Sequence, residues 1–143
     1  MLKVFLGGTV AGYDWRKIVE KEFKCDRNIE LFNPIVSKWT KECVIRENKY
    51  KENCDISLFV ITPYLQGIYS IAEAVEESNK RPERTVFVIL EKVINNNEKE
   101  IRTFTEHMLH SLQVTGELIE RNGGQFFTSL EELIDYIKAR LRE

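Results

Sequence analysis

Five short apolar runs divide the chain, and each is followed by a polar turn. They are Leu2–Leu6, Glu30–Phe32, the run that begins at Leu58 and ends at the turn of Pro63, Thr85–Leu90 and Gln125–Phe127. Runs of this length, rich in β-branched and aromatic residues, predict β-strands and are too short for buried helices. The third and fourth runs are apolar throughout, which predicts strands that are buried on both faces of a sheet.

In the segments between these runs, apolar residues recur at the spacing of a helix. Asp14 precedes the first stripe as a helix cap, Lys41 to about Cys54 forms a polar helix, and Ser70 opens another. We expect a surface loop at Asn95–Asn97. The remaining stripes are Trp15, Ile18, Val19 and Phe23; Ile101, Phe104, Met108 and Leu112; and Leu130, Leu133, Ile134, Ile137 and Leu141.

Strands that alternate with helices predict one α/β domain over residues 1–143. The expected fold is a flavodoxin-like or Rossmann-like doubly wound sheet of five parallel strands, in the order 2-1-3-4-5, with helices on both faces. Sheets of this kind bind ligands at the carboxyl ends of their strands. Residues that the pattern brings to this edge are Gly7, Gly8, Thr9, Asp14, Asn33, Pro34, Tyr64, Gly67 and Ser70.

Glu73 is the candidate reactive group, because it falls in the first turn of the helix that follows the buried third strand. A second interpretation is structural. Ser70-x-x-Glu73 also has the spacing of a capping box, in which the glutamate only accepts a backbone hydrogen bond. The same spacing occurs at Thr128-x-x-Glu131, where capping is the only role that we predict.

Glu47 is a second candidate, because it shares a helix stripe with apolar and aromatic side chains. Cys43, Glu47, Tyr50 and Cys54 recur at helical spacing, which predicts that Glu47 faces inward. A buried carboxylate must be paired, hydrogen-bonded or functional. The alternative is a helix solvated on all sides, with Glu47 paired to Arg46 or Lys51.

Composition narrows the classes of partner. A hydrophobic content of 43% and a net charge of −2 describe an ordinary globular protein and favour neither a nucleic acid polymer nor an anionic membrane. We find no signal peptide and no apolar span of about 20 residues.

The three cysteines, Cys25, Cys43 and Cys54, predict buried free thiols in the cytoplasm. His107 and His110 lack a third ligand nearby, so no metal site is expected.

Several chemistries are excluded by missing motifs. The chain has no GxGxxG after its first strand, no GxxxxGK[ST] and no GxSxG, so we expect no dinucleotide or other cofactor and no serine nucleophile elbow. Two carboxylates in different environments, surrounded by hydroxyls and amides, suit glycosyl transfer.

The order of short motifs over residues 2 to 80 resembles the nucleoside 2-deoxyribosyltransferase-like family. The motifs are Gly-Gly-Thr after the first strand, Asp14-Trp15, Asn33-Pro34 followed by Trp39, Glu47, Asp55, and Gly67-x-x-Ser70-x-x-Glu73. The resemblance implies that Glu73 attacks the anomeric carbon, that Glu47 handles the base, and that the glycine turn and Asn33-Pro34 help to form the nucleoside pocket. It also implies a homo-oligomer. Gly67 stands where the best-known transferases carry an aspartate that contacts the base.

The expected activity is therefore cleavage of the N-glycosidic bond of a nucleoside or nucleotide through a glycosyl-Glu73 intermediate, with transfer to another base or to water. Two alternatives remain open at this point. One is a TIR-like NAD glycohydrolase, since that fold also uses a glutamate on a helix. The other is a sensor that binds a nucleotide without turnover.

Overall fold

The protein is described by a computed structural model that covers residues 1–95 and 99–143. Five strands form a sheet in the order β2-β1-β3-β4-β7, and every neighbouring pair is parallel. The predicted order is confirmed, with β7 as the predicted fifth strand. The strands are β1 (Leu2–Gly8), β2 (Ile29–Phe32), β3 (Ile56–Ile61), β4 (Thr85–Ile89) and β7 (Gln125–Phe127).

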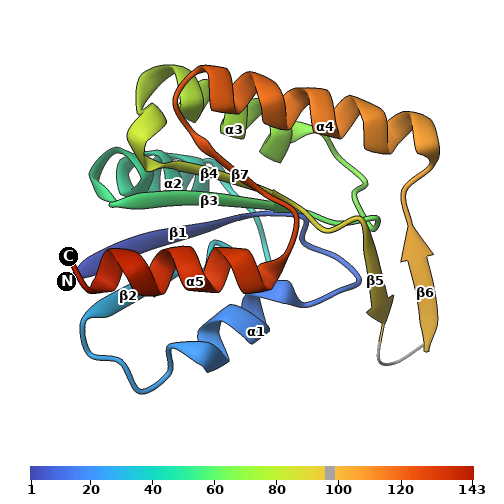
Figure 1. Cartoon of the computed structure of the whole chain (residues 1–143). Coiled ribbons are helices and arrows are strands. Elements are labelled where there is room, and N and C mark those ends of the chain that lie inside the picture. The colour runs from blue at the N-terminus through green and yellow to red at the C-terminus, as the bar shows by residue number, and fades with distance from the viewer. Residues whose placement is uncertain (96–98) are drawn as a thin grey trace.

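Helices cover both faces of this sheet (Figure 1). One face carries α1 and α5, and the other carries α2, α3 and α4. A short 3-10 helix, Pro82–Arg84, leads from α3 into β4. The helices are α1 (Trp15–Glu22), α2 (Lys41–Asn53), α3 (Tyr69–Lys80), α4 (Glu106–Arg121) and α5 (Leu130–Leu141).

The core has two halves, one on each face of β3. All six residues of this strand are buried. Side chains of a strand alternate between its faces, so Leu58 and Val60 pack in the cluster with α1 and α5, whereas Phe59 and Ile61 pack in the other. The prediction of a strand buried on both faces is confirmed.

The segment between β4 and α4 differs from the prediction. A two-stranded antiparallel sheet forms there from β5 (Lys92–Asn95) and β6 (Glu100–Thr103), and it projects beside the carboxyl edge of the main sheet (Figure 1). The predicted helical stripe at Ile101 and Phe104 is wrong: Ile101 is an exposed strand residue, and the helix begins only after Thr105, whose side chain caps it. Of the predicted loop Asn95–Asn97, Asn95 ends β5 and the other two residues lie outside the described part of the chain.

Two further predicted details change, the cap of α5 and the burial of the cysteines. The cap of α5 is shifted by one residue from the predicted Thr128-x-x-Glu131: Ser129 accepts from the backbone of Glu132, whose carboxylate in turn accepts from Ser129 and Thr128. The cysteines are all free, as expected, but only Cys54 is buried. None of the helices within residues 1–95 and 99–143 has the length and apolar character needed to cross a bilayer.

Gly8, the last residue of β1, is predicted to be irreplaceable. Its φ is +123°, and a Cβ atom there would lie 2.1 Å from the carbonyl oxygen of Val60. Gly8→Ala should therefore lower the free energy of unfolding by at least about 2 kcal/mol. Gly67→Ala is the matched control, since nothing lies within 4 Å of a Cβ there, and it should change stability by less than about 0.5 kcal/mol. Urea denaturation of both variants measures the difference; equal stability would contradict the close approach at Gly8.

Candidate functional site

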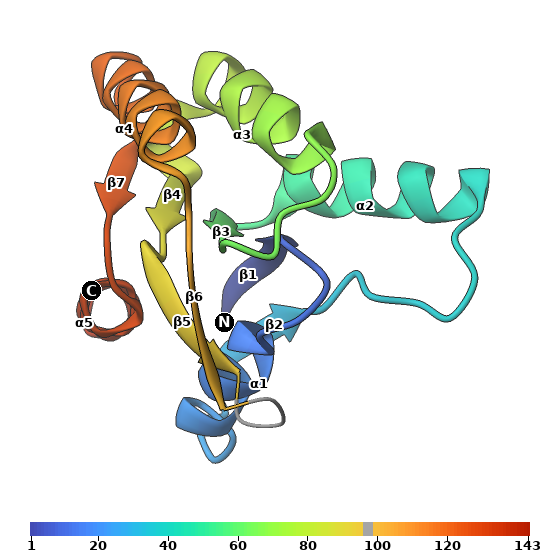
Figure 2. The same cartoon turned by 90° about the vertical axis from the view of Figure 1, so that its right-hand side faces the viewer.

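A cavity of about 510 Å³ opens at the carboxyl edge of the sheet. Its walls come from the segments that follow β1, β2 and β3 and from helices α2 and α3; Figure 2 looks toward this edge. The volume is typical of a small-molecule site, and many of its lining side chains are apolar or aromatic, as in most ligand pockets. The apolar and aromatic lining residues are Phe5, Val10, Ala11, Pro34, Ile35, Val36, Trp39, Tyr64, Leu65 and Tyr69.

Most of the predicted site residues line this one cavity. Gly7, Gly8 and Thr9 come from the end of β1 and the turn after it, and Pro34 follows β2. Glu47 is on α2, and the segment from β3 into α3 brings the remaining members. The predicted residues that line the cavity are Gly7, Gly8, Thr9, Pro34, Glu47, Tyr64, Gly67, Ser70 and Glu73.

Asp14 and Asn33 were also predicted for the site but do not line the cavity. Asp14 is the N-cap of α1 and accepts from the backbone N–H of Lys17 at 3.1 Å. The amide of Asn33 donates to Glu20 at 3.2 Å, and its oxygen accepts from the backbone of Ile35 at 3.0 Å. Both side chains are therefore committed to local structure outside the cavity.

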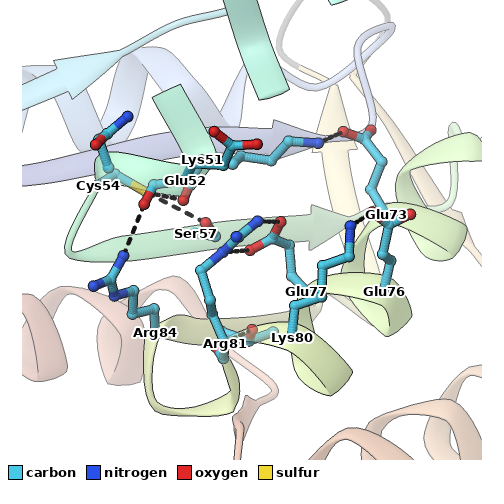
Figure 3. Close-up of polar contacts among 12 residues, drawn as sticks. Lys51, Glu52, Cys54, Ser57, Glu73, Glu76, Glu77, Lys80, Arg81 and Arg84 are labelled. Atoms are coloured by element: carbon cyan, nitrogen blue, oxygen red, sulfur yellow. Dashed lines mark hydrogen bonds and ion pairs between the residues drawn. The ribbon is translucent and has the colours of Figure 1, made fainter. Parts of the chain in front are cut away.

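Glu73 does not cap its helix. The N-cap of α3 is Ile68, with no side-chain cap, and Ser70 is already the second helical residue. The capping interpretation of Ser70-x-x-Glu73 is therefore wrong. Instead, Glu73 Oε2 accepts from Lys51 Nζ at 2.5 Å, across the gap between α3 and α2 (Figure 3).

Glu47 is one of the two buried residues of α2; the other is Lys51. The interpretation that this helix is solvated on all sides is thus wrong. Burial raises the pKa of Glu47 above its usual range, and the neighbouring charge of Glu73 raises it further, whereas Lys51 and a hydrogen bond from Trp39 oppose this rise. The cavity therefore holds two carboxyl groups in different electrostatic environments, one ion-paired and one with a raised pKa.

Arg16 is a buried cation that our sequence analysis missed. Its guanidinium donates to the carbonyl oxygens of Leu6, Gly8 and Thr9, at 2.9, 3.2 and 2.8 Å. These bonds fix the backbone of the glycine turn that forms one wall of the cavity. Burial lowers the pKa of Arg16 to about 10. The sequence carries no signal that separates Arg16 from its charged neighbour Lys17 in the first turn of α1.

Thr9 joins two walls of the cavity. Its hydroxyl accepts from the backbone N–H of Thr62 at 3.0 Å, and its carbonyl accepts from the indole of Trp15 at 3.0 Å. The turn after β1 is thus tied both to the segment after β3 and to α1. This explains why residues far apart in the sequence form one rigid rim.

Tyr64 connects the cavity to the β5–β6 hairpin. The guanidinium carbon of Arg102, on β6, lies 4.3 Å from the centroid of the tyrosine ring. Such a cation–π contact is attractive, and Val93 of β5 is buried in the core beside it. The hairpin is therefore packed against the wall of the cavity.

No group of three or more histidine, cysteine or acidic side chains in the described part of the chain is arranged to hold a metal ion. His107 and His110 are exposed on α4.

A family model described as "Nucleoside 2-deoxyribosyltransferase like" matches residues 1–93. The match spans the four strands β1 to β4 and every residue that lines the cavity. No curated protein matches the chain.

The raised pKa of Glu47 predicts a pH-dependent stability difference. An ordinary glutamate titrates near pH 4.3. Between that value and the raised folded value, the native state binds more protons than the unfolded chain, so stability is lost as the pH rises through this window. Glu47→Gln, which stays neutral, should therefore be more stable than the wild type at about pH 8 and lose this advantage at about pH 4.

Glu76→Gln is the matched control for this measurement, because the pKa of Glu76 is shifted the opposite way. A hydrogen bond from Lys80 lowers it, so ionised Glu76 stabilises the fold above its ordinary pKa and this contribution is lost in acid. The control should show a small loss of stability at about pH 8, since the pair is exposed. Urea denaturation at both pH values decides; an equal effect of Glu47→Gln at both would contradict the buried environment of Glu47.

Proposed function

The chain belongs to the nucleoside 2-deoxyribosyltransferase-like family, and from this we propose that it cleaves the N-glycosidic bond of a nucleoside or nucleotide at the cavity described above. The family supports glycosyl transfer or N-glycosidase activity in general. The mechanism through Glu73 and Glu47 is our proposal. The observation that carries it is a single cavity lined by two glutamates in unlike environments.

Glu73 serves as the nucleophile. One carboxylate oxygen attacks the anomeric carbon of the sugar, a C–O ester bond forms, and the C–N bond to the base breaks with its electron pair going to the base nitrogen. A covalent sugar ester divides one difficult displacement into two easier ones. The ion pair with Lys51 supports this role, because it holds the carboxylate in one place at the cavity wall.

Glu47 serves as the proton donor for the leaving base. Its raised pKa increases the fraction that is protonated near neutral pH. Proton transfer from Glu47 neutralises the base as the glycosidic bond breaks. In the second half, the resulting Glu47 carboxylate accepts a proton from water or from an incoming base, whose oxygen or nitrogen attacks the anomeric carbon and releases Glu73.

The cavity wall fits the two parts of such a substrate. Trp39 and Tyr69 offer aromatic faces that would accept a flat base, and the glycine turn offers backbone groups for the sugar. Gly67, in place of the usual aspartate, leaves open space at the expected base contact. The base is therefore held mainly by stacking and shape.

Two further expectations are part of this proposal. The free state of all three cysteines agrees with a cytoplasmic location. The homo-oligomer implied by the family resemblance stays a prediction.

Glu73→Gln is predicted to abolish turnover while the fold is kept. The amide can still accept from Lys51 but cannot form the ester, so the rate of base release should fall at least about 10³-fold. Chromatography of free base from a panel of deoxynucleosides, ribonucleosides, their 5′-phosphates and NAD measures this. Glu76→Gln is the control, because it makes the same exchange on the same helix but in an exposed ion pair. This variant should keep the wild-type rate.

The same panel separates the alternatives. Cleavage of NAD alone would favour the NAD glycohydrolase. Nucleotide binding with no product over hours, unaffected by Glu73→Gln, would favour the sensor and would sink the enzymatic proposal.

Hydrolysis is predicted to be at least comparable to base exchange. An acceptor base must be held in place to compete with water for the glycosyl ester, and Gly67 provides no side chain to hold it. Incubation of a deoxynucleoside with an excess of a second free base gives the ratio of exchanged nucleoside to free deoxyribose. Efficient exchange with little free sugar would show that this prediction is wrong, and Gly67→Asp should then change the ratio little.

A further inference from the structure

Lys51 is a buried cation in the wall between α2 and α3. Its side chain is 5% exposed, and its Nζ lies 2.5 Å from Glu73 Oε2 and 5.5 Å from the centroid of the Phe5 ring. A lysine is rarely buried without a partner, because an uncompensated charge is costly away from water. The ion pair with Glu73 is the contact that compensates it (Figure 3).

Lys51 also acts on Glu47. The two residues are one helical turn apart on α2, with the glutamate on the N-terminal side, which is the favourable orientation for an ion pair. The charge of Lys51 lowers the pKa of Glu47, whereas the charge of Glu73 raises it. One buried cation therefore pairs with one of the carboxyl groups that line the cavity and acts electrostatically on the other.

We propose that Lys51 is a positioning residue that serves as counter-ion to Glu73 before glycosyl transfer and to Glu47 while the sugar is held as an ester. This inference rests on the proposed function. Lys51 contacts neither the sugar nor the base in this scheme. It acts through the two glutamates.

The proposal follows from the balance of charge in the first half-reaction. In this scheme the reacting form of the site has an ionised Glu73, a charged Lys51 and a protonated Glu47. When the C–O ester forms on Glu73 and the C–N bond breaks, the proton of Glu47 moves to the base, which leaves as a neutral molecule. Glu73 is then a neutral ester and Glu47 is negative, so the charge of the three side chains is unchanged and Lys51 always has a partner.

The contact with Lys51 also distinguishes the two oxygens of Glu73. Oε2 accepts from Lys51, which leaves Oε1 as the oxygen that attacks. The same contact holds the carboxylate in one rotamer, and a fixed reacting geometry lowers the barrier. In the second half-reaction, the charge of Lys51 stabilises the ionised form of Glu47. This carboxylate accepts the proton from water or from the incoming base.

Other charged or titratable groups face this trio from the neighbouring elements. They are Arg16 from α1, Cys43 and Arg46 from α2, and Glu76 from α3. All remain in a Lys51 variant, so a shift in the pH profile reports the loss of Lys51 itself.

Lys51→Met tests the proposal through the pH profile of kcat/KM for base release. The alkaline limb of this profile follows loss of the proton from the donor, Glu47. Removal of the cation that lowers the pKa of Glu47 should move this limb to higher pH and lower kcat about 10²-fold through lost positioning of Glu73. Lys51→Arg should leave the alkaline limb in place, and Lys80→Met, which breaks an exposed lysine–glutamate pair on α3, should change nothing.

The possible results are separable. If the wild type releases no base, the proposed function falls and this inference falls with it. If the wild type is active and Lys51→Met only lowers the rate with the alkaline limb unmoved, Lys51 is structural and the inference alone is overturned. Lys51→Gln is measured in the same way, so that failure of the methionine variant to fold does not prevent the test.

Discussion

The close parallel pairing of β1 with β3 is the constraint on which the cavity depends. The two strands pair as far as Gly8 and Val60, and the backbone N–H of Thr9 continues the contact to the carbonyl of Val60 at 2.9 Å. Because Gly8 has no side chain, the turn that follows β1 lies directly against the end of β3. Arg16 then fixes this turn by donating to three carbonyl oxygens. The turn forms one wall of the cavity, and the segments after β2 and β3 form the walls beside it.

Helices α2 and α3 bring the carboxyl groups of Glu47 and Glu73 into a cavity that is otherwise largely apolar. An isolated ionised group there would be costly, so the carboxylate of Glu73 is compensated by Lys51 and the carboxyl of Glu47 is shifted toward its neutral form. The two glutamates are thereby held in unlike electrostatic environments, and the proposed division of roles between a nucleophile and an acid rests on this difference. The difference arises from burial and one shared cation.

The main sheet was predictable because β3 and β4 are uniformly apolar and every segment between the strands carries turn or helix signals. The grouping of Glu73, Glu47 and the glycine turn followed from sheet topology, since parallel strands end at one edge.

Local patterns in the sequence predicted side-chain contacts less reliably. Ser70-x-x-Glu73 has the spacing of a capping box, yet the ion pair to a helix far away in sequence determines where Glu73 points. Lys51 was considered as a surface partner of Glu47, because no sequence pattern reveals which lysine becomes buried by tertiary packing. The β5–β6 hairpin was missed because Ile101 and Phe104 happen to continue the helical period of α4 toward its N-terminus.

The contact between Arg102 and Tyr64 has a consequence for how the cavity can be varied. Arg102 lies on β6, beyond the residues that the family model matches, whereas Tyr64 lies within them and lines the cavity. A segment outside the matched region thus supports one wall of the cavity. Substitution on the hairpin can reshape that wall and leave both glutamates untouched, so the shape of the cavity can be varied independently of its charge.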